Sequence, residues 1–296
     1  MIVIGSRGSK LALWQAGHIG EQLKALGVET RIEIIKTSGD RIQDVPLAQA
    51  GGKGLFTKEI DEALLGGAID LAVHSMKDVP TGLPGGLTIA AIPEREEPRD
   101  ALIGYSLAEL RDGLRVGTSS LRRQAQLLAH RPGLSLEMLR GNVDTRLRKL
   151  DEGQYDAIVL AAAGLRRLGW QNRIRELIPV EIMCPAVGQG ALAIETREDG
   201  GAAHEMVRKL DHPDTRTAVT AERSMLEKLG GGCTLPVGGY AYLEKGVIHM
   251  RALVASPDGA HVVRAELSGV DPARTGASIS RILMEQGAQE ILNAIE

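Results

Sequence analysis

The sequence has few aromatic residues and few cysteines. Aromatic side chains make up 2% of the 296 residues, which leaves few platforms on which nucleic-acid bases could stack. The two cysteines lie far apart and give neither a disulfide framework nor the ligand spacing of a zinc site. We therefore expect no metal ion and a reducing, cytoplasmic location.

An excess of basic charge and a long apolar run are also lacking. The formal net charge is −3, so no general positive field attracts nucleic acid. No stretch of about 20 apolar residues could cross a membrane, and the start Met1-Ile2-Val3-Ile4 is typical of a short strand, not of a signal peptide. These absences predict a protein that has neither nucleic acid nor a membrane as its partner.

Strand-like and helix-like segments alternate along most of the chain, which is typical of an α/β protein with parallel sheets covered by helices. Its length predicts two or three small domains. We expect strands over residues 2–6, 30–36, 69–73, 87–92, 101–104, 115–117 and 135–139, and an apolar run over 157–163. We expect helices over residues 10–26, 56–65, 107–111, 120–130, 143–150 and 215–229.

Proline-containing stretches at 93–98 and 185–190 are typical of crossovers. Hairpin-like strands over 240–243, 247–254 and 261–267, followed by a helix over 275–295, predict a small C-terminal α+β domain.

Three of the expected strand-to-helix turns carry arginine. They are Ser6-Arg7-Gly8-Ser9, Gly117-Thr118-Ser119-Ser120-Leu121-Arg122-Arg123 and Arg140-Gly141-Asn142-Val143-Asp144-Thr145-Arg146. Ligands of open α/β sheets bind at the carboxyl ends of strands, and helix N-termini hold anions. Arg122 and Arg123 lie in a first helical turn, where a cation is unfavourable, so a bound anion would explain them. The alternative is that they are solvated or pair with nearby acidic residues. The forked guanidinium suits carboxylate or phosphate, and because no GxxxxGK[ST] pattern is present, nucleotide binding is the weaker interpretation.

A carboxylate and a thiol lie in two further turns. Asp78, beside Lys77, follows a buried strand, where a carboxylate can stabilise a developing cation or move a proton; it could instead cap the turn before Pro80. Cys233 lies within the glycine-rich stretch 230–239, in which glycines permit positive φ and close approach to a bulky group. The alternative is a free cysteine packed in an apolar niche.

Five short motifs then occur in a fixed order and together resemble the porphobilinogen deaminase (hydroxymethylbilane synthase) family. They are Ser75-Met76-Lys77-Asp78, Gly117-Thr118-Ser119-Ser120-Leu121-Arg122-Arg123, Arg140-Gly141-Asn142, Ala186-Val187-Gly188-Gln189-Gly190 and Gly231-Gly232-Cys233. The resemblance runs from Arg7 to about Gly239, and the C-terminal domain fits by length and pattern. Cys184 lies outside these motifs, and we interpret it as structural.

The resemblance implies two type-2 periplasmic-binding-protein-like βα domains linked by two crossovers, plus a small C-terminal α+β domain. Domain 1 would take residues 1–93 and 189–211, domain 2 residues 98–183, and domain 3 residues 217–296 with the cysteine loop. The implied protein is a cytoplasmic, monomeric transferase of tetrapyrrole, porphyrin and heme biosynthesis. It would polymerise four porphobilinogen molecules head to tail, with release of ammonia, into the linear tetrapyrrole hydroxymethylbilane. The chain would grow on a dipyrromethane cofactor attached through Cys233.

The resemblance also implies a role for each site residue. Asp78 would be catalytic and would stabilise the cationic intermediates. The cofactor would be bound by Cys233, Ser75, Lys77, Thr118, Ser120, Arg122, Arg123 and Arg146. The substrate would be bound by Arg7, Ser9, Arg140, Arg146, Arg167, Lys53 and Phe56. The loop over residues 38–54, with Lys53 and Phe56, would close over the site and exclude water.

A hypothesis from a different class keeps the fold without the catalysis. A two-lobed binding or sensing module for a small dicarboxylate would explain the arginine turns. It would not explain a thiol within a glycine loop or Asp78 beside Lys77. The intact mass of the purified protein separates the two hypotheses, because only the enzyme would carry two pyrrole units on Cys233.

Overall fold

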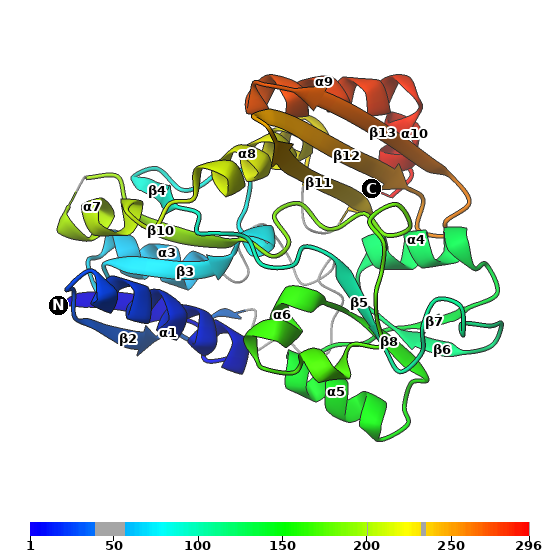
Figure 1. The fold of residues 1–296 in the computed structure, drawn as a ribbon, viewed down its shortest axis with the longest axis horizontal. Helices are drawn as coiled ribbons and strands as arrows, with labels where there is room; N and C mark the ends of the chain where they lie inside the picture. Colours follow the sequence, from blue (N-terminus) through cyan, green and yellow to red (C-terminus); the bar gives the residue numbers. More distant parts are fainter. Residues whose placement is uncertain (39–56, 200, 232–234, 296) are drawn as a thin grey trace. The chain divides into compact units, whose positions relative to one another are not determined.

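The computed structural model describes residues 1–38, 57–199, 201–231 and 235–295 (Figure 1). These residues form two compact units, one of Met1–Arg95 with Ala191–Arg216 and one of Glu96–Gly190 with Thr217–Glu296. The chain passes from one unit to the other close to the stretches 93–98 and 185–190, which the sequence marks as crossovers. The finer division into three domains stays a prediction.

The first unit is built on a five-stranded sheet with the order β2-β1-β3-β10-β4. Its strands are β1 (Ile2–Ser6), β2 (Thr30–Ile34), β3 (Leu71–Ser75), β4 (Leu87–Ala91) and β10 (Leu192–Arg197). Its helices are α1 (Lys10–Ala25), α3 (Lys58–Leu65) and α7 (Ala202–Arg208). Strand β1 is parallel to β2 and β3, whereas β10 is antiparallel to β3 and β4. Ile19 and Leu23 of α1 and Val207 of α7 share one buried cluster with Ile4 of β1, so helices cover this sheet.

The second unit contains another five-stranded sheet, with the order β7-β6-β8-β5-β9. Its strands are β5 (Asp100–Ile103), β6 (Arg115–Gly117), β7 (Ser135–Glu137), β8 (Ala157–Ala161) and β9 (Glu176–Leu177). Helices α4 (Leu121–His130), α5 (Val143–Asp151) and α6 (Ala162–Arg167) follow its three parallel strands. Strand β5 is antiparallel to β8 and β9.

The two five-stranded sheets share one connectivity. In each, the first parallel strand lies between the second and the third, and an antiparallel strand pairs with the third. That antiparallel strand, β10 or β5, is the first strand after the chain passes between the units. This confirms that the chain contains two βα sheets of one design. The sheets are mixed, however, and not purely parallel as the alternation of segments had suggested.

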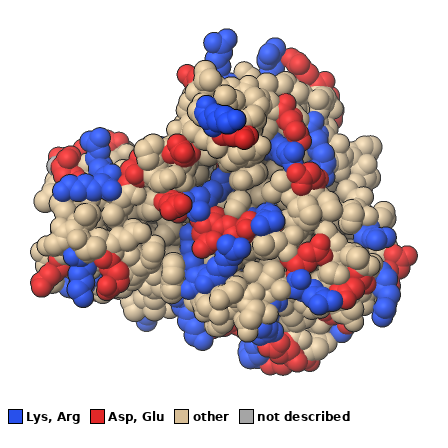
Figure 2. All heavy atoms as spheres, viewed as in Figure 1, with Lys and Arg blue, Asp and Glu red and all other residues tan. Residues whose placement is uncertain are grey.

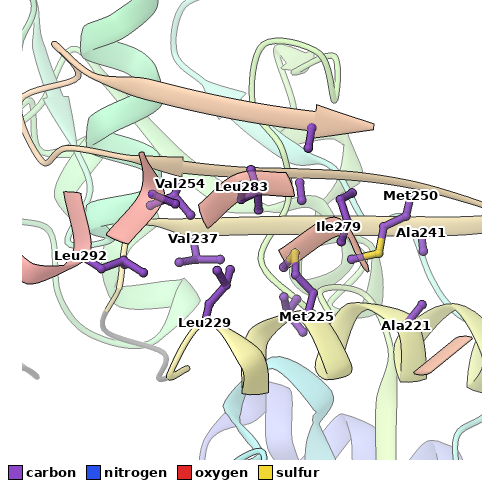
Figure 3. Packing of buried hydrophobic residues seen from close by; sticks show 14 of the residues in the cluster. Ala221, Met225, Leu229, Val237, Ala241, Met250, Val254, Ile279, Leu283 and Leu292 are labelled. Atoms are coloured by element: carbon purple, nitrogen blue, oxygen red, sulfur yellow. The ribbon is translucent and has the colours of Figure 1, made fainter. Parts of the chain in front are cut away.

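The second unit also contains the predicted C-terminal α+β domain. Strands β11 (Val237–Glu244), β12 (Val247–Ala255) and β13 (Val262–Gly269) form an antiparallel sheet. The helices of this part of the chain are α8 (Pro213–Lys228), α9 (Pro272–Glu285) and α10 (Ala288–Asn293). Met225 of α8 and Leu283 of α9 pack in one buried cluster with Val237, Met250 and Val254 of the sheet (Figure 3). This cluster fixes the beginning of β11, which closely follows Cys233 in the sequence.

Two predicted elements are wrong, and some observed elements were not predicted. Residues 107–111 form turns and no helix, because Leu107 and Leu110 reach the core from a segment too short to continue one. The helix expected over 275–295 is divided at Gly287, whose φ of 98° breaks the helix. The sequence did not predict α7, β10 or the short β9. No helix among the described residues is long and apolar enough to span a membrane.

Candidate functional site

Acidic and basic side chains alternate over the visible face of the molecule (Figure 2). This agrees with the net charge of −3, and no large patch of a single sign covers the face in view. The predicted anion site therefore depends on individual arginines at defined positions, and each unit contains some of them.

In the first unit, the predicted residues lie at the carboxyl ends of neighbouring strands. Arg7 follows β1, and the segment Ser75–Asp78 ends β3 and forms the short 3-10 helix η1 (Met76–Asp78). Since β1 and β3 are parallel, with Gly5 opposite Ala72, their ends meet at one edge of the sheet. Ser9 accepts a hydrogen bond from Ala12 N–H at 3.2 Å and caps α1. These residues therefore lie at the carboxyl edge of the first sheet.

The turn that carries Asp78 is held from several sides. Gln15 of α1 donates from Nε2 to Ser75 Oγ at 3.0 Å, and Met76 N–H donates to Ala191 O at 3.0 Å. Met76 and Val79 are buried, whereas Asp78 itself is exposed. The backbone of the turn is therefore anchored on both sides of a carboxylate that solvent and ligands can reach.

A buried group of acidic residues lies next to this turn in the sequence and in the sheet. His74, the residue before Ser75, places Nε2 3.0 Å from Glu195 Oε2 of β10, and both side chains are buried. Asp61 of α3 is 8% exposed. Burial, together with the charge of Glu195, raises the pKa of the Asp61 carboxyl to about 6. Among the residues with a described position, no cluster of three or more His, Cys, Asp and Glu side chains could hold a metal ion.

In the second unit, the predicted residues follow three adjacent parallel strands. Thr118 and Ser120 follow β6, Arg140 follows β7, and Arg167 lies in α6, which follows β8. Ser120 N–H donates to Thr118 Oγ1 at 3.2 Å. Arg146 of α5 donates from Nε to Gly141 O at 2.7 Å. The structure therefore brings these residues to one edge of the second sheet, as expected.

Arg122 and Arg123 flank a single buried carboxylate. Arg122 Nη1 donates to Asp100 Oδ2 at 2.8 Å, and Arg123 donates to Asp100 Oδ1 from Nε at 3.0 Å and from Nη2 at 2.8 Å. Gln189 Nε2 also donates to Asp100 Oδ1, at 2.9 Å. All of these residues are at least nine-tenths buried. The alternative that the arginines pair with an acidic residue is thus realised, but two guanidinium groups share one carboxylate.

Electrostatics show how this cluster is balanced. Burial alone would raise the pKa of Asp100, but the charges of Arg122 and Arg123 hold it well below its usual range. Desolvation lowers the pKa of the Arg123 guanidinium and lowers that of the buried Arg167 to about 10. Arg167 donates from Nη2 to Gly190 O at 2.7 Å. Buried cations in excess of buried anions are costly unless an anion accompanies them, which makes this region suited to an anionic ligand.

Three predicted site residues, Cys233, Lys53 and Phe56, lie outside the described residues, as does the loop over 38–54 beyond Ser38. The glycines on both sides of Cys233 are described in part. Gly230 has φ 79°, as the left-handed end of a helix requires. A Cβ on Gly238 would lie 2.9 Å from Cys184 O and 3.0 Å from Cys184 Cβ. At Gly238 the close approach is therefore to this chain itself, and not to a bulky ligand as the sequence had suggested.

The sequence analysis did not identify the buried side chains that contact or adjoin the predicted site residues. Asp100 and Glu195 both lie within strands, and only a charged residue inside an otherwise apolar strand could have indicated them. Cys184 is buried, and its thiol pKa is raised to about 12, chiefly by desolvation. Its Sγ lies 3.8 Å from Arg251 O, to which it donates. These contacts support the interpretation of Cys184 as structural.

A cavity of about 330 Å³ lies elsewhere in the first unit. Its lining includes Met1, Asp70, Arg197 and His204. Those residues belong to the start of β1, the approach to β3, the end of β10 and α7. They mark the edge of the sheet opposite to Asp78, so the cavity contains none of the predicted site residues.

The fold is that of an α/β protein with two five-stranded sheets of one connectivity, and arginine-bearing turns follow their strands. Among solved structures, similar ones include a periplasmic substrate-binding protein of an ABC transporter from Coxiella burnetii, with a TM-score of 0.44 and 14% identity over 72% of this chain and 93% of that chain. The methionine-binding protein MetQ also has a TM-score of 0.44, with 16% identity over 71% of this chain and 89% of its own.

Sequence comparison is more specific. Residues 2–205 match the family model of the porphobilinogen deaminase dipyrromethane cofactor-binding domain, and residues 216–285 match that of the porphobilinogen deaminase C-terminal domain. A porphobilinogen deaminase of Syntrophobacter fumaroxidans is 50% identical over 303 residues, covering 100% of this chain and 98% of that relative. One of Geobacillus kaustophilus is 49% identical over 301 residues, covering 100% and 97%. The chain belongs to the porphobilinogen deaminase family.

Proposed function

We propose that this chain is a transferase that joins four porphobilinogen molecules head to tail, releases one ammonia for each, and delivers the linear tetrapyrrole hydroxymethylbilane. The family match over residues 2–205 and 216–285 supports the reaction. The observation that carries the proposal is the pairing of Arg122 and Arg123 with a single buried carboxylate, Asp100. Two cations to one anion leave a positive charge that a carboxylate ligand would balance.

The residues of the second unit fit the cofactor that the family match names. A dipyrromethane carries acetate and propionate groups, so its binding site must supply cations and hydrogen-bond donors. Arg122 and Arg123 supply the buried charge, and Arg146, Thr118 and Ser120 lie at the same sheet edge. Guanidinium groups pair with carboxylates through two parallel hydrogen bonds, which fixes orientation as well as affinity. When bound, the dipyrromethane would supply the free pyrrole carbon to which the first substrate is joined.

The residues of the first unit would act on the incoming substrate. Loss of ammonia from porphobilinogen leaves positive charge on the pyrrole system, and a carboxylate at a fixed position stabilises that charge more in the transition state than in the neutral ground state. Asp78 is exposed at the end of an anchored turn and would take this role. Lys77 and Ser75 of the same turn would contact the cofactor.

Substrate carboxylates would be bound by the remaining arginines and their neighbours. Arg7 and Ser9 lie at the carboxyl edge of the first sheet, and Arg140 and Arg167 at that of the second. We propose further that Lys53 and Phe56, with the loop over 38–54, exclude water from the reacting groups, since water would capture the deaminated substrate.

We propose the three-domain division with bounds 1–93 and 189–211, 98–183, and 217–296. The first two would hold the sheets described above, and the third would hold Cys233 between α8 and β11. We also propose that the protein acts as a monomer in the cytoplasm.

Replacement of Cys233 by serine tests the proposal. The intact mass of the parent protein, made in cells that supply porphobilinogen, should exceed the polypeptide mass by two pyrrole units. The Cys233→Ser variant should have the bare polypeptide mass, an unchanged circular dichroism spectrum and almost no formation of hydroxymethylbilane. A parent protein with the bare polypeptide mass, or a variant with near-normal turnover, would reject the proposal and favour the dicarboxylate-binding module.

A further inference from the structure

The segment between β7 and α5 has its backbone held by side chains. Residues 138–141 belong to neither element, and a carbonyl group outside regular structure needs another hydrogen-bond partner. Here all four successive carbonyl groups accept a hydrogen bond from a side chain. The donors, in chain order of the acceptors, are Tyr155 Oη at 2.8 Å, Ser119 Oγ at 2.9 Å, Lys149 Nζ at 3.4 Å and Arg146 Nε at 2.7 Å. The backbone on both sides of Arg140 is therefore held from three other parts of the chain.

The two hydroxyl donors come from segments next to the neighbouring strands of the sheet, in which β6 lies between β7 and β8 (Figure 1). Ser119 follows β6, and Tyr155 precedes β8. Tyr155 is 9% exposed and packs in one buried cluster with Leu139. Burial raises the pKa of the Tyr155 hydroxyl, so this group is an O–H donor at neutral pH. The sheet itself thus places both hydroxyls against the segment.

The conformation on either side of Arg140 is restricted as well. Leu139, the residue before it, is fully buried. Gly141, the residue after it, has a φ of 112°, which favours glycine. A Cβ at Gly141 would lie 2.8 Å from Thr145 Cγ2. With the neighbouring carbonyl groups also held, the half-buried Arg140 side chain starts from a fixed point.

Ser119 lies between Thr118 and Ser120, two residues proposed to bind the cofactor. Their turn is held without the Ser119 hydroxyl, because Thr118 N–H donates to Glu137 O at 2.9 Å and Ser120 N–H donates to Thr118 Oγ1 at 3.2 Å. The Ser119 hydroxyl donates instead to Leu139 O. It therefore links the turn after β6 to the segment after β7, a role that the sequence motif around it does not indicate.

We propose that Ser119 and Tyr155 are positioning residues that set Arg140 for a carboxylate of the substrate. Neither side chain contacts the substrate, and each holds a carbonyl group that precedes Arg140. A guanidinium binds a carboxylate through two parallel hydrogen bonds, which requires a fixed orientation. Loosening of the segment therefore weakens substrate binding. This inference rests on the proposed function, because it assumes that Arg140 binds the substrate.

The test measures KM and kcat of the cofactor-loaded enzyme with porphobilinogen. Ser119→Ala and Tyr155→Phe each remove one hydroxyl and keep the rest of the side chain, whereas Ser119→Thr keeps a hydroxyl on the same carbon. Ser224→Ala is the matched control, because Ser224 of α8 is also half-buried and donates to a backbone carbonyl, Ala273 O, at 2.9 Å. Intact mass gives the cofactor content, and circular dichroism shows whether each variant is folded.

We expect the KM of Ser119→Ala and of Tyr155→Phe to rise about three- to tenfold, which is the scale of one lost hydrogen bond. The kcat should stay within about twofold, and each variant should carry the full cofactor, because the residues that contact it are unchanged. Ser119→Thr and Ser224→Ala should keep the parental KM within about twofold. A parental KM in folded Ser119→Ala and Tyr155→Phe, or an equal rise in Ser224→Ala, would overturn the proposal. If Ser119→Ala does not fold, Tyr155→Phe alone decides.

A second comparison separates positioning from a general loss of stability. In the Arg140→Leu background, Ser119→Ala should raise KM by less than about twofold, because its effect passes through a guanidinium that has been removed. A further rise of about three- to tenfold in that background would overturn the proposal. The proposed function fails separately, if the parent forms no hydroxymethylbilane. An active parent and a raised KM in Arg140→Leu, with the parental KM in both hydroxyl variants, would refute the positioning role alone.

Discussion

The two five-stranded sheets have the same strand order but opposite buried charge. In the first unit, Asp61 and Glu195 accompany one histidine, His74, and the pKa of Asp61 is raised to about 6. In the second unit, Asp100 accompanies two arginines, and its pKa is held well below the usual range. Asp61 and Asp100 are both desolvated, which raises the pKa of a carboxyl group, and at Asp100 the neighbouring arginines reverse this effect.

The comparison suggests a hypothesis: two sheets of the same connectivity carry different charges, one suited to an anionic ligand and the other to a cationic one. The second sheet collects buried arginines at its carboxyl edge, which suits an anionic cofactor. The first presents an exposed carboxylate, Asp78, and buries two carboxyl groups, Asp61 and Glu195, which suits a substrate that becomes cationic. If this division is correct, substitutions in the two units should fail in different ways.

The largest effect is expected from the arginines of the second unit. Arg122→Leu and Arg123→Leu should prevent retention of the cofactor and reduce turnover to background, because each removes buried positive charge. Each also leaves Asp100 with one guanidinium, at a cost of about 3 kcal/mol in the free energy of unfolding. Intact mass gives the cofactor content, and urea titration gives the stability. Arg148→Leu, which removes an exposed arginine paired with Glu152, is the control. Fully loaded Arg122→Leu and Arg123→Leu would show that these arginines serve only the fold.

In the first unit, Asp78→Asn should affect turnover more than binding. The substitution keeps the size and one acceptor oxygen but removes the charge, so we expect kcat to fall about a hundredfold while KM stays within a fewfold. Asp78→Glu should retain measurable activity. The measurement is single-turnover release of ammonia by variants loaded with preformed cofactor, with Asp151→Asn as an exposed control in the other unit. A rate for Asp78→Asn within threefold of the parent would mean that Asp78 is structural.

Arginines that would bind only the substrate should give a smaller and different effect. Arg7→Leu and Arg140→Leu, one from each unit, should keep the cofactor but raise KM or block an early addition. Loss of a charge-assisted contact costs about 1.5–3 kcal/mol, which is about ten- to a hundredfold in KM. Steady-state kinetics together with intact mass separate these outcomes. Loss of the cofactor from Arg7→Leu would contradict the assignment of its role.

The sequence predicted most strands and helices because their apolar periodicity and flanking turns are local. It did not predict β10 as a strand of the first sheet. Nor did it predict the direction of β5, since an apolar strand has the same pattern in a parallel or an antiparallel pair. The prediction of a helix over 107–111 was wrong because two leucines three positions apart in a short turn resemble one turn of a helix. The long C-terminal helix failed because Gly287 was not recognised as a break.

For the site, the sequence predicted the residues at the strand ends but not those that support them. Arg122 is 22 positions from Asp100 in the sequence, and no periodicity connects them. Likewise, Tyr155 and Met138 meet only because the approach to β8 packs against the end of β7. Such partners are set by tertiary contacts, which is why a motif can indicate an anion site without showing what balances it.

The smallest effect on turnover is expected from substitution of Asp61, the buried carboxyl group of the first unit that is compared with Asp100 of the second. Its pKa of about 6 lies above the ordinary value of 3.8, so the folded state binds a proton that the unfolded state releases. The stability that this proton provides is present at low pH and is lost as pH rises from about 4 through 6. Glu195 and Glu62 add negative charge, whereas His74 and the Thr57 hydroxyl partly offset it. The folded protein should therefore lose about 1–3 kcal/mol through this group by pH 7.5.

Asp61→Asn imitates the protonated carboxyl and cannot ionise, so it should lack this loss. We expect its melting temperature to equal that of the parent below about pH 3.8 and to exceed it at pH 7.5, with turnover within twofold of the parent at pH 7.5. Glu21→Gln, an exposed residue of α1 that is not among the groups acting on Asp61, should leave the pH dependence of the parent almost unchanged. Asp100 would behave in the opposite sense, because its charged form is the one that the fold stabilises. A constant difference in melting temperature between Asp61→Asn and the parent across this pH range would show that Asp61 does not titrate there, and that the acidic excess of the first unit is balanced by other groups.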